Sequence, residues 1–399
     1  MLSRFISGLG DSFHLTAICW YTFTINNNGS ATALVLACYF VPRVFFAPLG
    51  GILADCFPRR KLMIYADLIR ASLVLIIPIL IKFWPLDAIC LLCTVNFVLS
   101  TVTMVFKPSE VGVVRELINK KQLIKANGFL EATSSIVRCV GPCLAGLLLT
   151  FLSISSLFYL DALSFLLSAM LLYFIKAGND SSSSKFSELV RASFFKEQSI
   201  GFKIIIKNKL SLTLVLTMMI SNLVVGGISM IILPNLSNAY LLGLPGFGAL
   251  ESALGLGMIL GGLFVSRLTK SINELNLVLV GLVIMASAYL VMSFSYVFMI
   301  KVFCCFVAGF GAMPLLLVSI AVMQLLSTGA NVGRVFSAMG TIISASLPAS
   351  LGIIHLMVSK FGVENTLCYS SLFMFTISVL FYFIMRRWQL TRLITEIKA

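Results

Sequence analysis

Apolar runs of about twenty residues recur along the whole chain and are separated by short polar stretches. As a helix rising about 1.5 Å per residue, each run can cross a hydrocarbon core about 30 Å thick. The pattern predicts an all-α membrane protein with about twelve transmembrane helices. The first six are expected at 5–25, 31–54, 62–81, 86–106, 127–149 and 157–175. The second six are expected at 212–233, 248–268, 275–294, 297–323, 337–358 and 366–385.

A polar, basic stretch separates the two sets of helices. Residues 176–211 begin with a serine-rich tract and continue as a basic segment with apolar residues interleaved. This segment is expected to be a cytoplasmic linker, either solvated or partly an amphipathic helix on the lipid surface. The predicted organisation is therefore an N-terminal six-helix bundle at 1–175, a C-terminal six-helix bundle at 212–386 and a cytoplasmic tail at 387–399.

The two predicted bundles resemble copies of one unit. Pro108 and Pro142 recur as Pro314 and Pro348 at one constant offset. A duplicated six-helix unit is typical of transporters in which two bundles rock about a central site. The sequence thus predicts two pseudo-symmetric bundles.

Composition supports a membrane location and explains the net charge of +14. With 59% hydrophobic residues and a mean hydropathy of +1.04, the chain has more apolar surface than one soluble core can bury. If the N-terminus is cytoplasmic, most of the 29 Lys and Arg lie at cytoplasmic helix ends. The exceptions are Lys82, Lys301 and Lys360 at the other face and Arg43, Arg70 and Arg138 within helices. This positive-inside pattern predicts a multi-pass protein of the cell (inner) membrane with both termini cytoplasmic, and it argues against nucleic-acid binding.

The sequence indicates neither a cofactor nor a metal. Nearly all of the ten cysteines lie inside predicted helices, where a thiol acts as a small apolar group, and the chain has only two histidines. There is no G-x-x-x-x-G-K-S/T loop, so ATP is not expected to drive the protein directly. Polar residues interrupt the first apolar run, so no cleavable signal is expected.

The loop after the second predicted helix carries a dense group of charges. The group consists of Gly51, Asp55, Arg59, Arg60 and Lys61. Its spacing resembles the loop between the second and third helices of the major facilitator superfamily, although Cys56 and Pro58 stand where that family has a cation and a glycine. The resemblance implies a conformational latch. Asp55 would face the N-terminal end of the eleventh helix, and the cations would anchor the loop at the inner leaflet.

The fifth predicted helix carries a second motif of the same superfamily. Its residues are Gly128, Gly141, Pro142 and Gly146. They are similar to the antiporter signature, with Val137 and Ala145 in place of two glycines. Glycine and proline let a helix bend and pack closely, so the motif is open to two interpretations: export, or helix packing only.

Longer stretches of the first half resemble the macrolide-efflux and siderophore-export branch of the superfamily. They include FVPRVFFAPLGGILAD at 40–55 and FKPSEVGVVRELINKKQLIKANGFLEA at 106–132. The segment KANGFLEAT within this region resembles, more weakly, the lysophospholipid transporters. The resemblance implies the fold and the transport of a small molecule, and it leaves the cargo open.

Charged side chains inside the predicted helices are the candidates for transport chemistry, because each costs about 2.5 to 3.5 kcal/mol at a helix centre. The candidates for transport and proton coupling are Asp11, His14, Arg43, Glu131 and Arg138. The pairs Asp67–Arg70 and Glu131–Arg138 each share a helix face and are also interpretable as internal ion pairs. Asp161 and Glu251 are expected near the outer face as gate or interface groups.

These features predict a secondary active transporter and not an enzyme. The expected activity is export of an amphipathic small molecule such as a drug, macrolide or siderophore by a monomer in the lipid bilayer. Protons would drive it through a carboxyl such as Asp11 or Glu131. The alternative within the same class is a lysophospholipid flippase. Alternatives from other classes are a non-transporting sensor and a membrane-embedded transferase, which would need a cluster of catalytic polar groups that the sequence does not offer.

Overall fold

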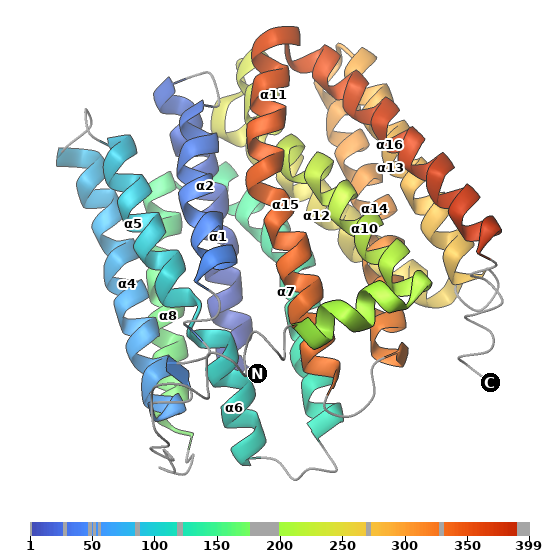
Figure 1. Ribbon diagram of the computed structural model, residues 1–399. Coiled ribbons are helices and arrows are strands. Elements are labelled where there is room, and N and C mark those ends of the chain that lie inside the picture. The colour runs from blue at the N-terminus through green and yellow to red at the C-terminus, as the bar shows by residue number, and fades with distance from the viewer. Residues whose placement is uncertain are drawn as a thin grey trace. The chain divides into compact units, whose positions relative to one another are not determined.

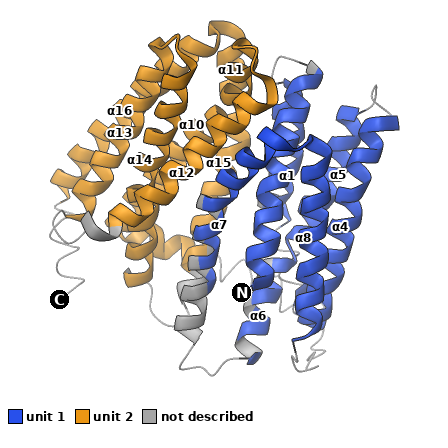
Figure 2. Ribbon diagram, turned by 180° about the vertical axis from the view of Figure 1, so that it is seen from behind, with its two compact units in different colours: residues 1–196 blue, residues 197–399 orange. Residues whose placement is uncertain are grey.

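The computed structural model describes residues 2–26, 30–46, 50, 53–54, 57–83, 88–117, 123–175, 199–268, 273–326 and 331–388. These residues are almost entirely helical and include no strand (Figure 1). The chain forms two compact units, Met1–Lys196 and Glu197–Ala399, called unit 1 and unit 2 below (Figure 2). Their boundary falls inside the segment 176–211. The role of that segment as a cytoplasmic linker stays a prediction.

The helices of unit 1 pack around α8. They are α1 (Leu2–Asn26), α2 (Ser30–Phe45), α4 (Arg59–Phe83), α5 (Ala88–Thr103), α6 (Phe106–Leu117), α7 (Leu123–Phe151) and α8 (Ile154–Tyr173). Helix α8 packs against both α1 and α4, while α2 packs against α5 and α1 against α7. The fourth predicted helix ends at Thr103, and a turn leads from it into α6.

In unit 2, one helix, α14, packs against two other helices. The elements are α10 (Lys209–Gly227), a π-helical turn (Ile228–Ile232), α11 (Leu233–Ala239), α12 (Gly243–Leu268), α13 (Glu274–Phe294), α14 (Phe298–Leu326), α15 (Asn331–Phe361) and α16 (Val363–Arg387). Helix α14 packs against α12 and α13, α16 packs against α13, and α10 packs against α15. Asparagine side chains cap two of these helices: Asn208 accepts from the backbone of Leu210 at 3.0 Å, and Asn273 accepts from that of Leu275 at 3.0 Å.

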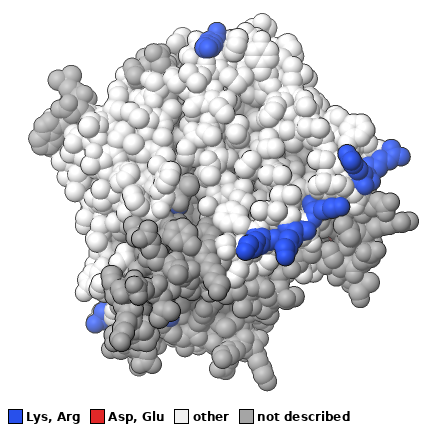
Figure 3. Space-filling view, in the orientation of Figure 1, with Lys and Arg blue, Asp and Glu red and all other residues white. Residues whose placement is uncertain are grey.

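Within the described residues, nine helices are long and apolar enough to cross a membrane. Two shorter apolar stretches, Ser30–Arg43 and Val140–Phe151, lie in α2 and α7. Large apolar side chains, among them Leu166, Met170 and Phe373, are exposed on the outside of the helices. The face in Figure 3 shows mostly uncharged side chains where residues are described. These exposed apolar side chains are suited to contact with lipid.

Glycines set the helix spacing in unit 2. A Cβ atom on Gly257 of α12 would lie 2.0 Å from the carbonyl oxygen of Phe306 in α14. A Cβ atom on Gly309 of α14 would lie 2.1 Å from the carbonyl oxygen of Leu254 in α12. A backbone oxygen cannot rotate away as a side chain does, so this approach requires glycine on both helices.

We expect Gly257→Ala to destabilise the protein by about 1 to 3 kcal/mol, because α12 and α14 must move apart to accept the methyl group. The measurement is the thermal unfolding midpoint of the purified protein in detergent. Gly352→Ala in α15 is the matched control, since its Cβ would meet no atom within 4 Å and alanine favours the helix. Equal midpoints for Gly257→Ala and the wild type would contradict this packing.

Candidate functional site

Helices α1 and α8 meet along a seam of small and polar residues. On α1 the seam consists of Ser3, Ser7, Gly10 and His14; on α8 it consists of Asp161, Ser164 and Ser168. A Cβ atom on Gly10 would lie 2.0 Å from Ser164 Oγ and 2.5 Å from Asp161 Oδ1, so glycine brings the two helices together. The seam places His14 directly beside Asp161.

His14 is held between two acceptors in the interior of unit 1. Its side chain is 1% exposed, with Nε2 2.9 Å from Asn96 Oδ1 and Nδ1 3.2 Å from Asp161 Oδ2. The amide nitrogen of Asn96 donates to the carbonyl oxygen of Leu92 at 2.8 Å, so the amide oxygen faces the ring and accepts from Nε2–H. The orientation of Asn96 therefore determines which ring nitrogen is protonated.

One proton remains to be placed between His14 Nδ1 and the carboxyl group of Asp161. A bare lone pair facing a buried carboxylate would be repulsive and would leave a net negative charge, so this proton lies between the two groups. The pair is then neutral, either as imidazolium and carboxylate or as imidazole and carboxylic acid.

The contact between His14 and Asp161 is not an aligned hydrogen bond. Within the described residues, His14 Nδ1 and both carboxyl oxygens of Asp161 are buried without a hydrogen-bond partner. Buried polar groups are normally hydrogen-bonded, so this close contact leaves the pair only partly satisfied.

Arg43 approaches the same pair through an aromatic ring. The ring of Tyr39 stacks on His14 with centroids 5.8 Å apart, and the guanidinium carbon of Arg43 lies 4.2 Å from the Tyr39 centroid. Arg43 Nε is buried without a hydrogen-bond partner in the described part of the chain, so a cation–π contact holds this side chain. We call His14, Tyr39, Arg43, Asn96 and Asp161 the His14 cluster.

The internal ion pair predicted for Asp67 and Arg70 is confirmed. Arg70 Nη2 contacts Asp67 Oδ1, and Ser168 donates to Asp67 Oδ2 at 2.6 Å. The guanidinium carbon of Arg70 also lies 4.1 Å from the ring centroid of Phe165. Ser168 in turn contacts Ser3 of α1 at 2.7 Å. The pair therefore joins α4, α8 and α1 and serves the structure of unit 1.

The other predicted coupling residues are not brought into the His14 cluster by direct contacts. Asp11 is half-buried on α1 and interacts electrostatically with Asp161 and Arg70. Glu131 and Arg138 lie in α7, but their side chains are outside the described residues. Coupling through Asp11 or Glu131 and the pairing of Glu131 with Arg138 stay predictions.

The predicted role of Asp161 and Glu251 as gate or interface groups near the outer face stays a prediction, and the structure adds that both side chains are buried. Their exposed fractions are 0% and 8%, and each is buried within its own unit. Helix α8 begins at Ile154 and α12 at Gly243, several residues before the apolar runs that predicted them. At about 1.5 Å per residue, Asp161 and Glu251 therefore lie roughly 10 to 12 Å along their helices.

The charged loop before α4 is only partly described. Gly51 and Asp55 lie outside the described residues, so the latch through Asp55 stays a prediction. Arg59 Nε donates to the carbonyl oxygen of Ala54 at 3.2 Å, and Lys61 is exposed.

Arg60 has a structural role within unit 1. Its Nε donates to the carbonyl oxygen of Leu172 at 3.0 Å, and its Nη2 donates to that of Tyr173. These carbonyl groups belong to the last turn of α8, which has no further helical donors. Arg60 thus caps the C-terminal end of α8, and its positive charge interacts favourably with the negative end of the helix dipole, in addition to any contact with lipid.

The glycine and proline motif of α7 packs against α1. A Cβ atom on Gly141 would lie 2.2 Å from Ser12 Oγ. Pro142 lies inside α7, Gly146 is buried, and Gly128 is helical with its surroundings outside the described residues. The contact of Gly141 supports the packing interpretation, and the link of this motif to export stays a prediction.

The sequence of the chain matches the model of the Major Facilitator Superfamily over residues 1–346. The chain belongs to the Major Facilitator Superfamily. It is therefore a membrane transporter with several membrane-spanning helices, as predicted, and the fold class is confirmed by solved structures of the same superfamily.

Three relatives of this superfamily member are informative. The uncharacterized MFS-type transporter YvqJ of Bacillus subtilis is 28% identical over 52% of this chain and 49% of its own length, so the chain spans about half of that relative. Macrolide efflux protein A of Streptococcus pyogenes is 25% identical over 86% of this chain and 85% of its own. The staphyloferrin A transporter of Staphylococcus aureus is 22% identical over 69% of this chain and 68% of its own. The predicted resemblance to the macrolide-efflux and siderophore-export branch is confirmed.

Two solved structures share the fold. A bacterial homolog of the human lysosomal transporter Spinster, in an inward-facing and unoccupied conformation, has a TM-score of 0.68 and 12% identity over 98% of both chains. The peptide transporter POT in complex with sulfate has a TM-score of 0.70 and 14% identity over 97% of this chain and 93% of its own. At these identities, the similarity establishes the architecture of this superfamily member and nothing about its cargo.

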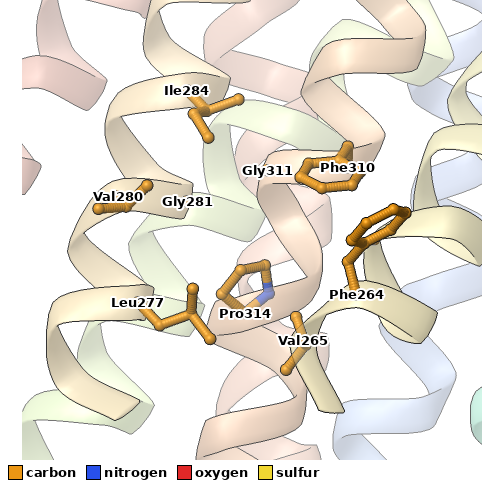
Figure 4. Close-up of a pocket in the computed structure, with 10 residues that line it drawn as sticks. Phe264, Val265, Leu277, Val280, Gly281, Ile284, Phe310, Gly311 and Pro314 are labelled. Carbon is orange, nitrogen blue, oxygen red and sulfur yellow. The ribbon is translucent and has the colours of Figure 1, made fainter. Parts of the chain in front are cut away.

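A small apolar cavity in unit 2 of the transporter is not suited to bind cargo (Figure 4). Its volume is about 40 Å³, whereas pockets for drug-sized ligands measure about 300 to 1,000 Å³. It lies among α12, α13 and α14 where Gly281 and Gly311 bring two backbones together. All of its lining residues are apolar, including Phe264, Phe310 and Pro314. The His14 cluster is thus the better candidate site for transport chemistry.

Sequence reasoning missed Tyr39 and Asn96 of the His14 cluster in this transporter, and it named Asp161 only as a gate or interface group. Asn96 is a lone amide in an apolar run and Tyr39 an aromatic among many, so neither stands out by residue type. A signal was available on α8, where Asp161, Ser164 and Ser168 recur on one helical face of an otherwise apolar helix. That polar stripe indicates a buried polar partner helix.

Proposed function

We propose that this transporter is a proton-coupled exporter of an amphipathic small molecule. Two relatives support a cargo of this kind, since one is named for macrolide efflux and the other for staphyloferrin A. The proposal places a monomer in the cell membrane with both termini in the cytoplasm, as the distribution of Lys and Arg in the sequence suggests.

The buried contact between His14 and Asp161 is the observation that carries proton coupling. A coupled cycle needs a group that accepts a proton from one side of the membrane and releases it on the other. The carboxyl group of Asp161 meets this need because it is buried, lies 3.2 Å from an imidazole nitrogen of His14 and stands at the contact of two helices. In the Asp67–Arg70 pair both carboxyl oxygens of Asp67 have a hydrogen-bond donor, whereas those of Asp161 have none within the described residues.

The same cluster offers a route for proton release. Protonation of Asp161 removes the negative charge that faces His14 Nδ1 across the 3.2 Å contact. The contact weakens, which favours a shift of α1 relative to α8. Arg43 lies close by on α2 with an unpartnered Nε, and its approach would favour the ionised carboxyl group of Asp161 and so expel the proton.

The experiment that tests the function uses purified protein in proteoliposomes with an imposed pH gradient. Three probes are compared side by side: a macrolide, a lipophilic cation and a lysophospholipid. We expect one of the two drugs to accumulate only while the gradient is present, and a protonophore to abolish its accumulation. Protein-free liposomes provide the control.

Two outcomes would contradict the proposal. Movement of the lysophospholipid alone, with or without the gradient, would indicate a flippase. Drug movement that reaches only equal concentrations on both sides and ignores the protonophore would show that protons are not coupled.

A further inference from the structure

Unit 2 contains a buried carboxyl group that belongs to none of the ion pairs described above. Glu251 lies on α12 with 8% of its surface exposed, and no hydrogen bond or ion pair joins it to any described residue. An unpaired carboxylate buried in this way costs several kcal/mol, so the group is far more stable when it carries a proton.

Among the described residues of α12, α13 and α14, no cation is paired with Glu251. From α12 to α14 the sequence contains only three cations, Arg267, Lys270 and Lys301. Along α12, Arg267 is about 24 Å from Glu251 at a rise of about 1.5 Å per residue. Lys301 is engaged elsewhere: its Nζ donates to the carbonyl oxygen of Met292 at 3.1 Å and lies 3.9 Å from Glu364 Oε1. Neutralisation of Glu251 therefore requires a proton.

The polar groups around Glu251 come from two further helices. Tyr289 of α13 and Cys305 of α14 interact with it electrostatically, and each is 1% exposed. The hydroxyl group of Tyr289 is buried without a hydrogen-bond partner in the described part of the chain. Cys304 and Lys301 lie further along α14, and α11, the other neighbour of α12, has no titratable residue between Leu233 and Ala239.

We propose that Glu251 is a proton-binding site of unit 2, distinct from the His14 cluster of unit 1. In the conformation described here its carboxyl group holds a proton, because burial disfavours the charge and no cation offsets it. The unpartnered hydroxyl group of Tyr289 is the donor that can stabilise the carboxylate once the proton leaves. Release requires water to reach the region between α12, α13 and α14.

Proton binding at Glu251 does not depend on the proposed transport function, but its use in a transport cycle does. In a coupled exporter whose cycle requires proton binding at the His14 cluster, Glu251 would supply a second proton per cycle. Glu251→Gln would then lower the number of protons moved per cargo molecule by one, while the His14 cluster continues to drive transport. If the wild type shows no proton-driven transport, the proposed function fails and the proton-binding result still stands.

Infrared difference spectroscopy tests the site directly. The carbonyl stretch of a protonated carboxyl group is absent from carboxylates, so the wild-type minus Glu251→Gln spectrum at neutral pH should contain this band. Glu364→Gln is the matched control: Glu364 is 50% exposed, and its difference spectrum should contain carboxylate bands only. Tyr289→Phe keeps the ring and should retain the band of Glu251. A Glu251→Gln difference spectrum with carboxylate bands alone would overturn the proposal.

A second measurement uses the wild-type protein and needs no variant to fold. Dicyclohexylcarbodiimide is an apolar reagent that takes the proton of a carboxylic acid on one nitrogen while the carboxylate oxygen adds to its central carbon; rearrangement gives a stable acylurea. Mass spectrometry should find the mass of one reagent molecule on the peptide that contains Glu251, formed faster than on the peptide that contains Glu364. Labelling at Glu364 in preference to Glu251 would argue against a protonated Glu251.

Discussion

Asp161→Asn is expected to abolish uphill transport while exchange of cargo continues. Asparagine keeps the volume of the side chain and can still bond to His14, but it cannot bind or release a proton at neutral pH. With a gradient of one pH unit, one coupled proton is worth about 1.4 kcal/mol and supports up to about a tenfold cargo ratio across the membrane. The variant should therefore fall from that ratio to equal concentrations.

The measurement pairs gradient-driven accumulation with counterflow of labelled against unlabelled cargo in the same proteoliposomes. Counterflow needs no net proton movement, so its persistence separates lost coupling from lost folding or binding. Glu364→Gln removes an exposed carboxyl group of unit 2 and should leave both assays unchanged. Full accumulation by Asp161→Asn would exclude the His14–Asp161 pair, and the same assay of Asp11→Asn and Glu131→Gln would then test the two other predicted carriers.

Arg70→Met should destabilise unit 1 severely. It leaves Asp67, which is 0% exposed, as a buried carboxylate without its cation. Removal of one partner of a buried ion pair typically costs about 3 to 5 kcal/mol, a large share of the stability of a folded protein. We expect a low yield of folded monomer and a much lower thermal unfolding midpoint in detergent.

The double variant Asp67→Asn with Arg70→Met is expected to recover most of the lost stability. It leaves no unpaired charge, and the amide oxygen of asparagine can still accept from Ser168. Arg386→Met, at an exposed position near the end of α16, is the control for loss of an arginine. A single variant as stable as the wild type, or a double variant no better than the single, would show that the pair does not hold unit 1 together.

Helix positions in this protein are largely predictable from hydropathy. The ninth helix was expected at 275–294 and is found at Glu274–Phe294, and the tenth was expected at 297–323 and is found at Phe298–Leu326. The helices that begin earlier than expected, such as α12 at Gly243, start in a segment rich in glycine that the apolar run does not include.

The chemistry of the candidate site was only partly predictable. His14 and Arg43 stand out in the sequence because charged and imidazole side chains are rare in apolar runs. Their partners Asn96 and Tyr39 do not, and Asp161 lies far from His14 along the chain. Spacing along a helix identifies neighbours on the same face, as it did for Asp67 and Arg70, but it carries no information about which face of another helix lies opposite.

The sequence by itself determined the class of fold, because a chain in lipid must satisfy its backbone hydrogen bonds within each apolar segment, and a helix is the way a single segment does so. The tertiary structure alone decided which polar groups meet. Close approach at Gly10 places His14 beside Asp161, and close approach at Gly257 and Gly309 joins the two helices that enclose Glu251 and Cys305. These contacts depend on the packing of small residues between segments that are distant in the sequence. A hydropathy pattern along one chain does not contain that information.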